Sequence, residues 1–528
     1  MAAVGLLPLA MAGCDGPSQA ASDASLFTVA LPADPGSLDP HHAATYGPAF
    51  MLAFAYDGLV VRGADLRPQP GLAQSWTQTS TAITYRLRDN ATCADGSPLT
   101  AADVAENFAY ILDPKNGSTL LGAGAPVGSK VSFDAAARTI TLTAPKPNSF
   151  LLDITGAVPI VCRPGLRDRI RLGRGTEGTG LYRLVKAQPN ESYAFELRQG
   201  YGWGPDGATS RTPGLPKRVE FRMIANATTA ANLLLAGQLT AAGVNGPDRQ
   251  RLEAAGFRAV TTRSPAIQMW FNQAPGRVTG DMEIRRALSM AISSDMIARA
   301  AGGGGRWALP ARRLAGADPM ACTTDTATGA SPRYDPVAAA RLLDRAGWLV
   351  GPDGVRVKDG RRLALQMVYD RELVDVSLMN AAAELAVAQW RAIGVEVKAR
   401  SVAGPVIAEV LFGTSEYDIN WVPIIVSLPN RLLMFTSGPT PPRGVNFPHL
   451  RLPAIEPLSE RANQLPGEAS CPIWDEVERE YLRSISAVPI MDADNPIYTR
   501  SASFRRNGLS IVAASIRMTP EPNPNPTN

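Results

Sequence analysis

The sequence contains little histidine and lysine and no concentrated positive charge. Only three of its 528 residues are histidines and seven are lysines, so arginine supplies most of the 52 basic residues, which 48 acidic residues balance. A nucleic-acid-binding protein gathers its basic residues into a patch, and the even spread of charge argues against one. The scarcity of histidine limits histidine-based catalysis, and the sequence has no nucleophile elbow, HExxH or SxxK motif.

Long apolar segments are also missing. The run from Ala2 to Gly13 is shorter than the roughly 20 residues that a membrane-spanning helix needs. It ends at Cys14 after Met11, Ala12 and Gly13, and small residues before a cysteine resemble a bacterial lipoprotein signal. No basic residue precedes the run, and Met11 replaces the usual Leu or Val, so the alternative is a helical N-terminus with a chance cysteine. We expect residues 1–25 to be a signal region and linker that anchors an exported protein through lipid on Cys14.

The other four cysteines are candidates for disulfide bonds. They are Cys93, Cys162, Cys322 and Cys471, and none has the CxxC spacing of a structural zinc site. In an exported chain they allow two disulfides in any of three pairings. If the chain folds into two lobes and each disulfide lies within one lobe, Cys93 pairs with Cys162 and Cys322 with Cys471. The alternative is four isolated, buried thiols.

Strand-like and helix-like segments alternate along the chain, which predicts α/β lobes with mixed sheets. Thr100 and Asp103 have the spacing of a capping box at the start of a helix. Residues 282–301 carry apolar side chains at helical spacing, which predicts one helix with Arg285 and Arg286 on its exposed face. The 47 glycines and 44 prolines are scattered, as expected for the turns between such elements.

Several motifs together resemble the peptide/nickel-type, family 5 extracellular solute-binding proteins of ABC importers. The strongest is the block 68–112, with a P-x-L-A-x-S-W-like core, a strand ending in Leu-Arg, an Asp-Gly-x-Pro-like turn and a Thr-Ala-x-Asp-Val helix start. Further matches follow in the family's order over nearly the whole chain: GSLDP (36–40), AYDGLV (55–60), GTGLYRL (178–184), MWFN (269–272), YDPVAAARLLDRAGW (334–348) and YDINW (417–421).

The resemblance implies a two-lobed α/β protein of the periplasmic-binding-protein type II (cluster C) fold. Its lobes would close over a ligand about two strands near residues 262–272 and 486–496. The expected division is lobe 1 from residues 26–61, 176–263 and 490–528, an inserted subdomain of lobe 1 at 62–175, and lobe 2 at 264–489.

The resemblance also implies a binding function without a cofactor. We expect a monomer outside the cytoplasm, periplasmic if the cell has an outer membrane, that delivers a peptide or peptide-like molecule to ABC permease subunits. Two alternatives remain open: a metal-chelate binder that uses His41 and His42, and an enzyme built on the same fold.

Peptide-binding relatives pair the peptide amine with an acidic residue after the YDxxxW-like segment. Here residues 421–431 contain no Asp or Glu, which favours a ligand that is N-blocked, neutral, or anionic with Arg431 as its partner. The alternative is that a carboxylate elsewhere in the chain, or one displaced by several residues in the alignment, takes this role. Aromatic and amide side chains suit a pocket that binds backbone-like groups. The residues that we expect in the cleft are Tyr46, Trp270, Asn272, Trp421, Asn430, Arg431 and Asn446.

Overall fold

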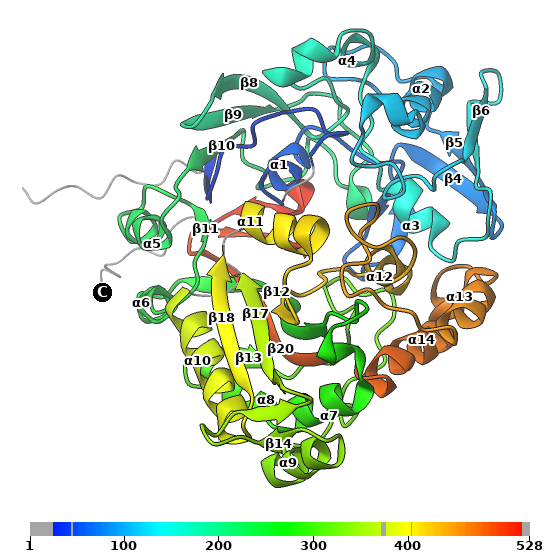
Figure 1. Ribbon diagram of the computed structural model, residues 1–528. Helices are drawn as coiled ribbons and strands as arrows, with labels where there is room; N and C mark the ends of the chain where they lie inside the picture. The colour runs from blue at the N-terminus through cyan, green and yellow to red at the C-terminus, as the bar shows by residue number, and fades with distance from the viewer. Residues whose placement is uncertain (1–24, 44–45, 371–375, 403, 520–528) are drawn as a thin grey trace, which may run out of the picture.

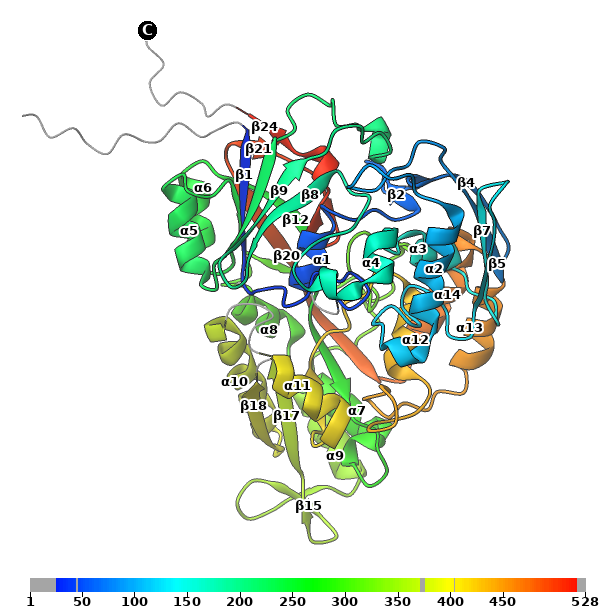
Figure 2. The same cartoon turned by 90° about the horizontal axis from the view of Figure 1, so that it is seen from above.

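A long mixed β-sheet runs through both lobes of the protein (Figures 1 and 2). The computed structural model describes residues 25–43, 46–370, 376–402 and 404–519. The main path of the sheet has the order β18-β17-β19-β12-β20-β11-β1-β10-β9-β8, with β13 paired to β20. These strands are β18 (Glu396–Val402), β17 (Ala364–Asp370), β19 (Ile419–Trp421), β12 (Arg258–Phe271), β20 (Ala487–Thr499), β11 (Ala241–Gly243), β1 (Leu26–Leu31), β10 (Arg218–Met223), β9 (Ser192–Leu197), β8 (Tyr182–Gln188) and β13 (Ala308–Leu309).

Two long antiparallel strands, β12 and β20, connect the lobes at the positions that the family resemblance implies for the hinge. They pair from Arg258 opposite Thr499 to Trp270 opposite Ala487. On the lobe 1 side β20 pairs with β11, and on the lobe 2 side β12 pairs with β19. The Nε of Arg263 on β12 donates to Asp492 on β20 at 2.7 Å, and burial raises the pKa of Asp492 to about 6.

Lobe 1 covers its part of the sheet with short helices and the C-terminal segment. Phe27 on β1 is fully buried and packs edge-on against Phe504 of that segment at 6.0 Å between ring centroids. The helices are α1 (Tyr46–Leu52), α5 (Ala227–Leu235) and α6 (Asp248–Ala254), and the small strands are β21 (Ala502–Ser503), β22 (Arg506–Asn507), β23 (Ser510–Ile511) and β24 (Arg517–Met518). Strand β2 (Val60–Arg62) leads into the inserted segment, which also contains β3 (Pro68–Pro70) and α4 (Arg163–Arg167).

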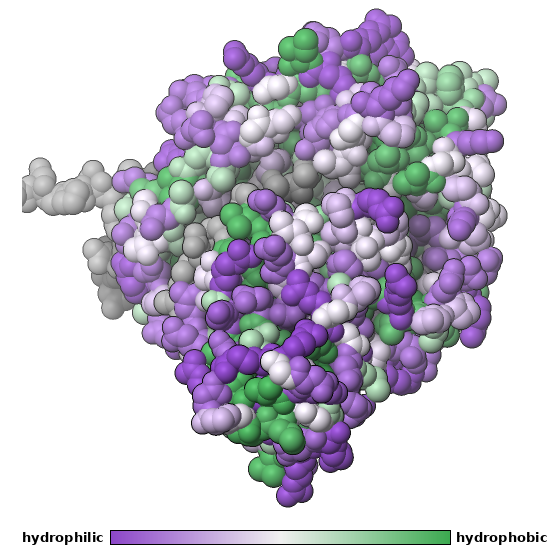
Figure 3. All heavy atoms as spheres, in the orientation of Figure 1, coloured by the Kyte–Doolittle hydropathy of each residue, from purple (hydrophilic) through white to green (hydrophobic). Residues whose placement is uncertain are grey.

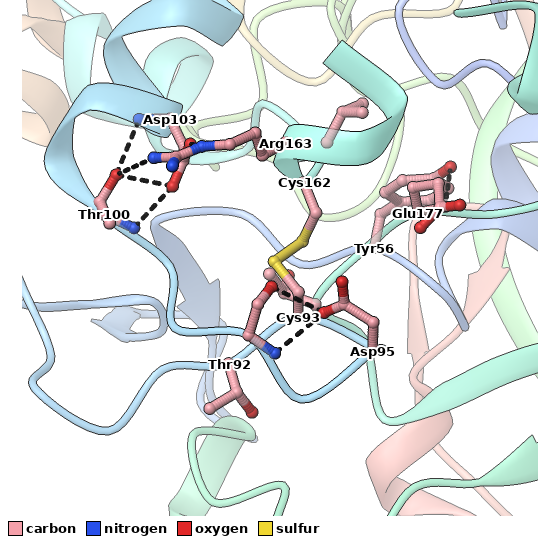
Figure 4. The surroundings of a disulfide bond; sticks show 12 residues. Tyr56, Thr92, Cys93, Asp95, Thr100, Asp103, Cys162, Arg163 and Glu177 are labelled. Atoms are coloured by element: carbon pink, nitrogen blue, oxygen red, sulfur yellow. Dashed lines mark hydrogen bonds and ion pairs between the residues drawn. A yellow bond between two sulfur atoms is a disulfide. The ribbon is translucent and has the colours of Figure 1, made fainter. Parts of the chain in front are cut away.

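The inserted segment forms its own antiparallel sheet in the order β4-β5-β7-β6. Thr100 accepts a hydrogen bond from the Asp103 backbone while Asp103 accepts from Thr100, which is the predicted capping box of α2. A disulfide joins Cys93 to Cys162, and Arg163 beside it donates to Asp103 at 2.8 Å (Figure 4). The elements are β4 (Ala73–Gln78), β5 (Ala82–Leu87), α2 (Ala101–Leu112), β6 (Lys130–Asp134), β7 (Thr139–Thr143) and α3 (Leu151–Gly156).

Lobe 2 packs its helices around the other end of the main sheet. A disulfide joins Cys322 to Cys471, so both bonds have the pairing that is predicted within the lobes. The helices are α7 (Met282–Met290), α8 (Ser294–Ala301), α9 (Pro336–Arg345), α10 (Val376–Ala392), α11 (Gly404–Glu409), α12 (Leu432–Thr436), α13 (Ile455–Asn463) and α14 (Cys471–Arg483), and β14 (Leu349–Val350), β15 (Arg356–Lys358) and β16 (Arg361–Arg362) form a small sheet.

Two expectations for residues 282–301 are wrong. The segment is two helices, because Ser293 caps a new helix by accepting a hydrogen bond from the Met296 N–H. Arg285 is only 4% exposed and donates to backbone carbonyls, including those of Ser484 and Ile485. The guanidinium therefore holds the chain that leads from α14 into the hinge strand β20.

Residues 1–24, which include Cys14, lie outside the described part of the chain, so the lipid anchor stays a prediction. None of the helices in the described ranges combines the length and the apolarity that a membrane crossing needs.

Candidate functional site

The two lobes face each other across the carboxyl ends of parallel strands. In lobe 2, β17 is parallel to both β18 and β19, and the arrowheads of β17 and β18 point toward lobe 1 in Figure 1. In lobe 1, β1 is parallel to β10 and β11. Because ligands of open α/β sheets bind outside the carboxyl ends of the strands, this boundary is the candidate binding cleft.

One short turn of lobe 2, Pro429–Arg431, contacts the inserted subdomain across the cleft. The Asn430 Nδ2 donates to the Asn148 Oδ1 at 3.2 Å. A guanidinium nitrogen of Arg431 donates to the backbone carbonyl of Ala123. Two of the residues predicted to bind ligand therefore lie where the lobes meet.

A second contact between the lobes is centred on Ser149 of the subdomain, which is 3% exposed. Its hydroxyl donates to the Ala462 carbonyl at 2.8 Å and accepts from the Trp474 indole nitrogen at 3.1 Å. Its backbone nitrogen donates to the Asn463 side chain at 3.1 Å. Helices α13 and α14 are thereby held against the subdomain, next to α3 (Figure 2).

The two tryptophans expected in the cleft lie on opposite faces of the sheet. Trp270 pairs with Asn420 in the register of β12 and β19, so its side chain shares the face of Asn420, and Trp421 points to the other face. Trp270 packs against Phe447 and Tyr481, whereas Trp421 belongs to the core under the lobe 2 helices. Both are fully buried, so the structure does not bring them together.

The hydrogen bonds of the two tryptophans also differ. The indole nitrogen of Trp270 donates to the Gln268 side chain at 3.1 Å. The indole nitrogen of Trp421 is buried and has no hydrogen-bond partner among the described residues. This N–H is therefore an unpaired donor that is buried in the lobe 2 core at the end of β19.

Two of the amide side chains predicted to bind ligand already form hydrogen bonds within lobe 2. Asn272 donates to the carbonyls of Ser415 and Tyr417, and Asn446 donates to the carbonyl of Leu450 at 3.1 Å. Their burial is nearly complete, which favours a structural role for both. Tyr46 is the first residue of α1, and its side chain lies outside the described atoms.

Gln268, which the sequence patterns do not single out, organises the lobe 2 wall of the cleft. It is 1% exposed and accepts hydrogen bonds from the Trp270 indole and from the Ile424 backbone nitrogen, the latter at 2.9 Å. It also donates to the Leu314 carbonyl at 2.9 Å. A glutamine in an apolar strand is the only local sign of this role.

The adjacent histidines do not form an open metal site. His41 is fully buried, with Nε2 donating to the Pro159 carbonyl at 3.1 Å and Nδ1 facing Arg169 at 3.1 Å. Burial and the charge of Arg169 lower the pKa of His41 to about 4. His42 bonds to Tyr110 at 2.9 Å. Across the described ranges, no group of three or more His, Cys, Asp or Glu side chains is arranged to hold a metal ion.

An apolar pocket of about 300 Å³ lies in lobe 2 beside the cleft. Its lining comes mainly from α11 and the turn after it, the segment after β19, and α12, and it includes Arg431. Apolar side chains reach the surface over α11, between the two lobes (Figure 3), and Val406 of this helix is 47% exposed.

A separate cavity of about 220 Å³ lies within lobe 1, between the segment after α1, helix α3 and the C-terminal strands. Asp57 is part of its lining, and its carboxylate accepts hydrogen bonds from Trp203 at 2.7 Å and Tyr201 at 3.2 Å. Burial raises the pKa of Asp57 to about 7, although these hydrogen bonds oppose the shift.

This raised pKa predicts a pH-dependent effect of Asp57→Asn. Between its unfolded pKa near 3.8 and its folded pKa near 7, Asp57 binds a proton more tightly in the folded state. The stability of the native protein therefore falls as pH rises through this window, by roughly 2–3 kcal/mol from pH 5 to pH 8. The asparagine variant lacks this loss, so its stability relative to the native protein should increase over the same range in urea denaturation.

The control for this prediction is Asp65→Asn, because the Asp65 side chain is 58% exposed. That variant should follow the native protein at both pH values. An Asp57→Asn variant whose relative stability is the same at pH 5 and pH 8 would show that Asp57 is ionised throughout.

The fold and the cleft define the class of the protein as a two-lobed solute-binding protein. Residues 67–424 match the model of the bacterial extracellular solute-binding proteins, family 5 middle region, and the chain belongs to this family. It is 30% identical over 377 residues to Protein XP55 of Streptomyces lividans, an alignment that covers 67% of this chain and 62% of that protein. The chain thus matches less than two thirds of that relative's length.

Two further similar proteins have names or structures that specify a ligand. The nickel-binding periplasmic protein of Escherichia coli (strain K12) is 25% identical over 397 residues, which cover 70% of each chain. A substrate-binding protein of Microbacterium hydrocarbonoxydans, solved with 4-hydroxybenzoate hydrazide, superposes with a TM-score of 0.73 at 23% identity. That comparison covers 94% of this chain and 100% of the other, and it shows the shared two-lobed fold.

Proposed function

We propose that this protein is the extracytoplasmic binding component of an ABC importer and captures a small peptide-like molecule between its lobes. The observation that carries the proposal is the boundary between the lobes, where the carboxyl ends of parallel strands from both lobes face each other beside a two-stranded connection. Closure of the lobes about that connection buries a ligand, and the ligand drives closure by binding the closed form more tightly.

The groups at the cleft suit a ligand without a free amine. Residues 421–431 offer no carboxylate, and the buried Trp421 indole N–H is a donor without a partner among the described residues. Asn430 and Arg431 add an amide and a cation where the lobes meet. An N-blocked peptide, or a neutral or anionic peptide-like molecule, satisfies these donors.

The same proposal includes delivery of the bound molecule to a membrane permease. A lipid on Cys14 would keep a monomeric binding protein beside its permease, and ATP would be hydrolysed on another subunit. The nickel-binding relative raises a metal chelate as a second ligand class, but the hydrogen bonds of His41 leave neither of its ring nitrogens free for a metal.

The first experiment identifies the ligand directly. Native mass spectrometry of the purified protein weighs any co-purified molecule, and thermal denaturation is then followed with pools of N-acetylated and free peptides of two to five residues. We expect an acetylated pool to raise the melting temperature without any product appearing. A product peak after incubation would instead identify an enzyme, and the absence of any shift in all pools would contradict peptide binding.

Trp421→Phe tests the donor in the cleft. Trp421 and Trp390 are both fully buried, so either change to phenylalanine loses packing. Because the Trp421 indole N–H has no partner among the described residues, Trp421→Phe should lower the melting temperature less than Trp390→Phe does. Its dissociation constant for the ligand found above should rise about 5- to 10-fold, measured by isothermal titration calorimetry.

Trp390→Phe is the matched control, since its indole nitrogen donates to the Leu288 carbonyl at 2.9 Å inside lobe 2. That variant should lose thermal stability and retain its affinity. An unchanged affinity in Trp421→Phe would assign Trp421 to packing alone.

A further inference from the structure

The apolar pocket of lobe 2 contains a largely buried cation, Arg431, with which no described carboxylate forms an ion pair. Of the described residues that line its 300 Å³, only Arg431 is charged, and the other twelve are apolar, among them Leu411, Phe412, Ile424 and Phe435. Burial lowers the pKa of Arg431. No described carboxylate forms an ion pair with Arg431, and its hydrogen bond goes to the backbone carbonyl of Ala123.

A buried charge is costly unless it is paired. A guanidinium has several N–H donors in one plane, arranged to bind a carboxylate through two parallel hydrogen bonds. The carbonyl of Ala123 uses one of the two terminal nitrogens of Arg431. The pocket thus offers both an apolar space and donors that suit an anion.

The size of the pocket limits what can enter. Pockets that enclose a whole drug-sized molecule have volumes of about 300–1,000 Å³, so this one lies at the lower limit. It has room for one aromatic ring or branched chain, and an oligopeptide would have to extend from it into the cleft. The surface above it is also apolar, because Ile425 and Met434 are 42% and 40% exposed.

We propose that this pocket binds the carboxylate end of an anionic ligand, with the carboxylate paired to Arg431 and a ring or branched chain between α11 and α12. This inference rests on the proposed binding function and gives its ligand a chemical class. The same chemistry occurs in a free aromatic or branched carboxylic acid and in the C-terminal residue of a peptide. Because Arg431 also contacts Ala123 of the subdomain, the ligand would bind where the lobes close.

Four probes separate these sources and test the charge. Isothermal titration with the full-length protein uses N-acetyl-L-phenylalanine, its neutral amide, 3-phenylpropanoate and glycyl-glycyl-L-phenylalanine. We expect the acetylated acid to bind at least tenfold more tightly than its amide. Comparable binding of 3-phenylpropanoate indicates a free acid as the natural ligand, and tighter binding of the tripeptide indicates a peptide terminus.

Arg431→Gln removes the cation. The affinity for the acid should fall about 10- to 100-fold, as expected for hydrogen bonds to a charged group, while the affinity for the amide stays the same. The melting temperature without ligand should be unchanged or higher, because an unpaired and largely buried charge is lost. The exposed Arg443 gives the control variant Arg443→Gln, which should bind the acid as the native protein does.

Ala408→Phe fills the pocket from α11, where the alanine side chain is exposed. It should abolish binding of the acid without lowering the melting temperature. If Arg431→Gln instead lowers the melting temperature and weakens acid and amide equally, Arg431 has a structural role and the inference is wrong.

The experiments distinguish a failure of this inference from a failure of the proposed function. If no carboxylate probe binds but an acetylated peptide pool or a co-purified molecule does, the pocket assignment is wrong and the binding function stands. If neither binds, the binding function itself is contradicted.

Discussion

Replacing Arg313 with leucine is expected to lower the free energy of unfolding by about 3–5 kcal/mol, because it leaves two buried carboxylates without their cation. Arg313 is 1% exposed and donates to Asp475 and to Glu478, each at 2.7 Å. Glu478 also accepts from the Thr326 hydroxyl at 2.9 Å, and burial raises its pKa despite Arg313. Urea denaturation followed by tryptophan fluorescence measures the loss.

The neighbouring Arg312 provides the control, because it is exposed. Arg312→Leu should change the free energy of unfolding by less than about 0.5 kcal/mol. If the two leucine variants denature at the same urea concentration, the buried network of Arg313, Asp475 and Glu478 contributes nothing to stability.

The network of Arg313, Asp475 and Glu478 holds together two segments that contact the cleft. Arg313 lies in the irregular segment between β13 and α9, and its two carboxylate partners lie on α14. The same helix carries Trp474, whose indole meets Ser149 of the subdomain. The adjacent Leu314 carbonyl accepts a hydrogen bond from Gln268, which positions the lobe 2 wall. Loss of Arg313 should therefore also loosen the contact between the lobes.

Local sequence patterns predict the elements that depend on local interactions. The capping box of Thr100 and Asp103 is satisfied by residues three apart, so its spacing alone reveals it. The helix break near Ser293 is hidden, because apolar spacing continues through it while the hydrogen bonds restart. The burial of Arg285 is hidden for a different reason, since two of the four carbonyls that bind it come from a segment about 200 residues away.

The candidate site is harder to predict because it depends on strand register. Trp421 is the last residue of β19 and Trp270 the last but one of β12. The pairing of Trp270 with Asn420 puts the two tryptophans on opposite faces, and a shift of one residue would reverse this. No single sequence reveals that register. In contrast, the absence of an acidic residue from 421–431 can be read directly, and it points to Arg431 without any knowledge of its surroundings.

Removal of the Cys322–Cys471 disulfide is the second change with a large expected effect. Replacing both cysteines with alanine should lower the free energy of unfolding by about 2–5 kcal/mol. The bond closes a loop of 149 residues, compared with 69 for Cys93–Cys162. In the chain-entropy model this difference makes the longer link more stabilising by about 0.7 kcal/mol, which a comparison of the two double-alanine variants in urea measures.

The same disulfide joins the segment of Arg313 to the first residue of α14. The disulfide and the buried network therefore both restrain the contact between this segment and α14. Their losses should not add: the variant that combines Arg313→Leu with both alanines should be less destabilised than the sum, by at least about 0.5 kcal/mol. Combining Arg313→Leu with loss of Cys93–Cys162, which joins different elements, should give an additive result. Strict additivity in both combinations would mean that the disulfide and the Arg313 network hold α14 independently of each other. The position of the cleft wall would then not depend on their acting together.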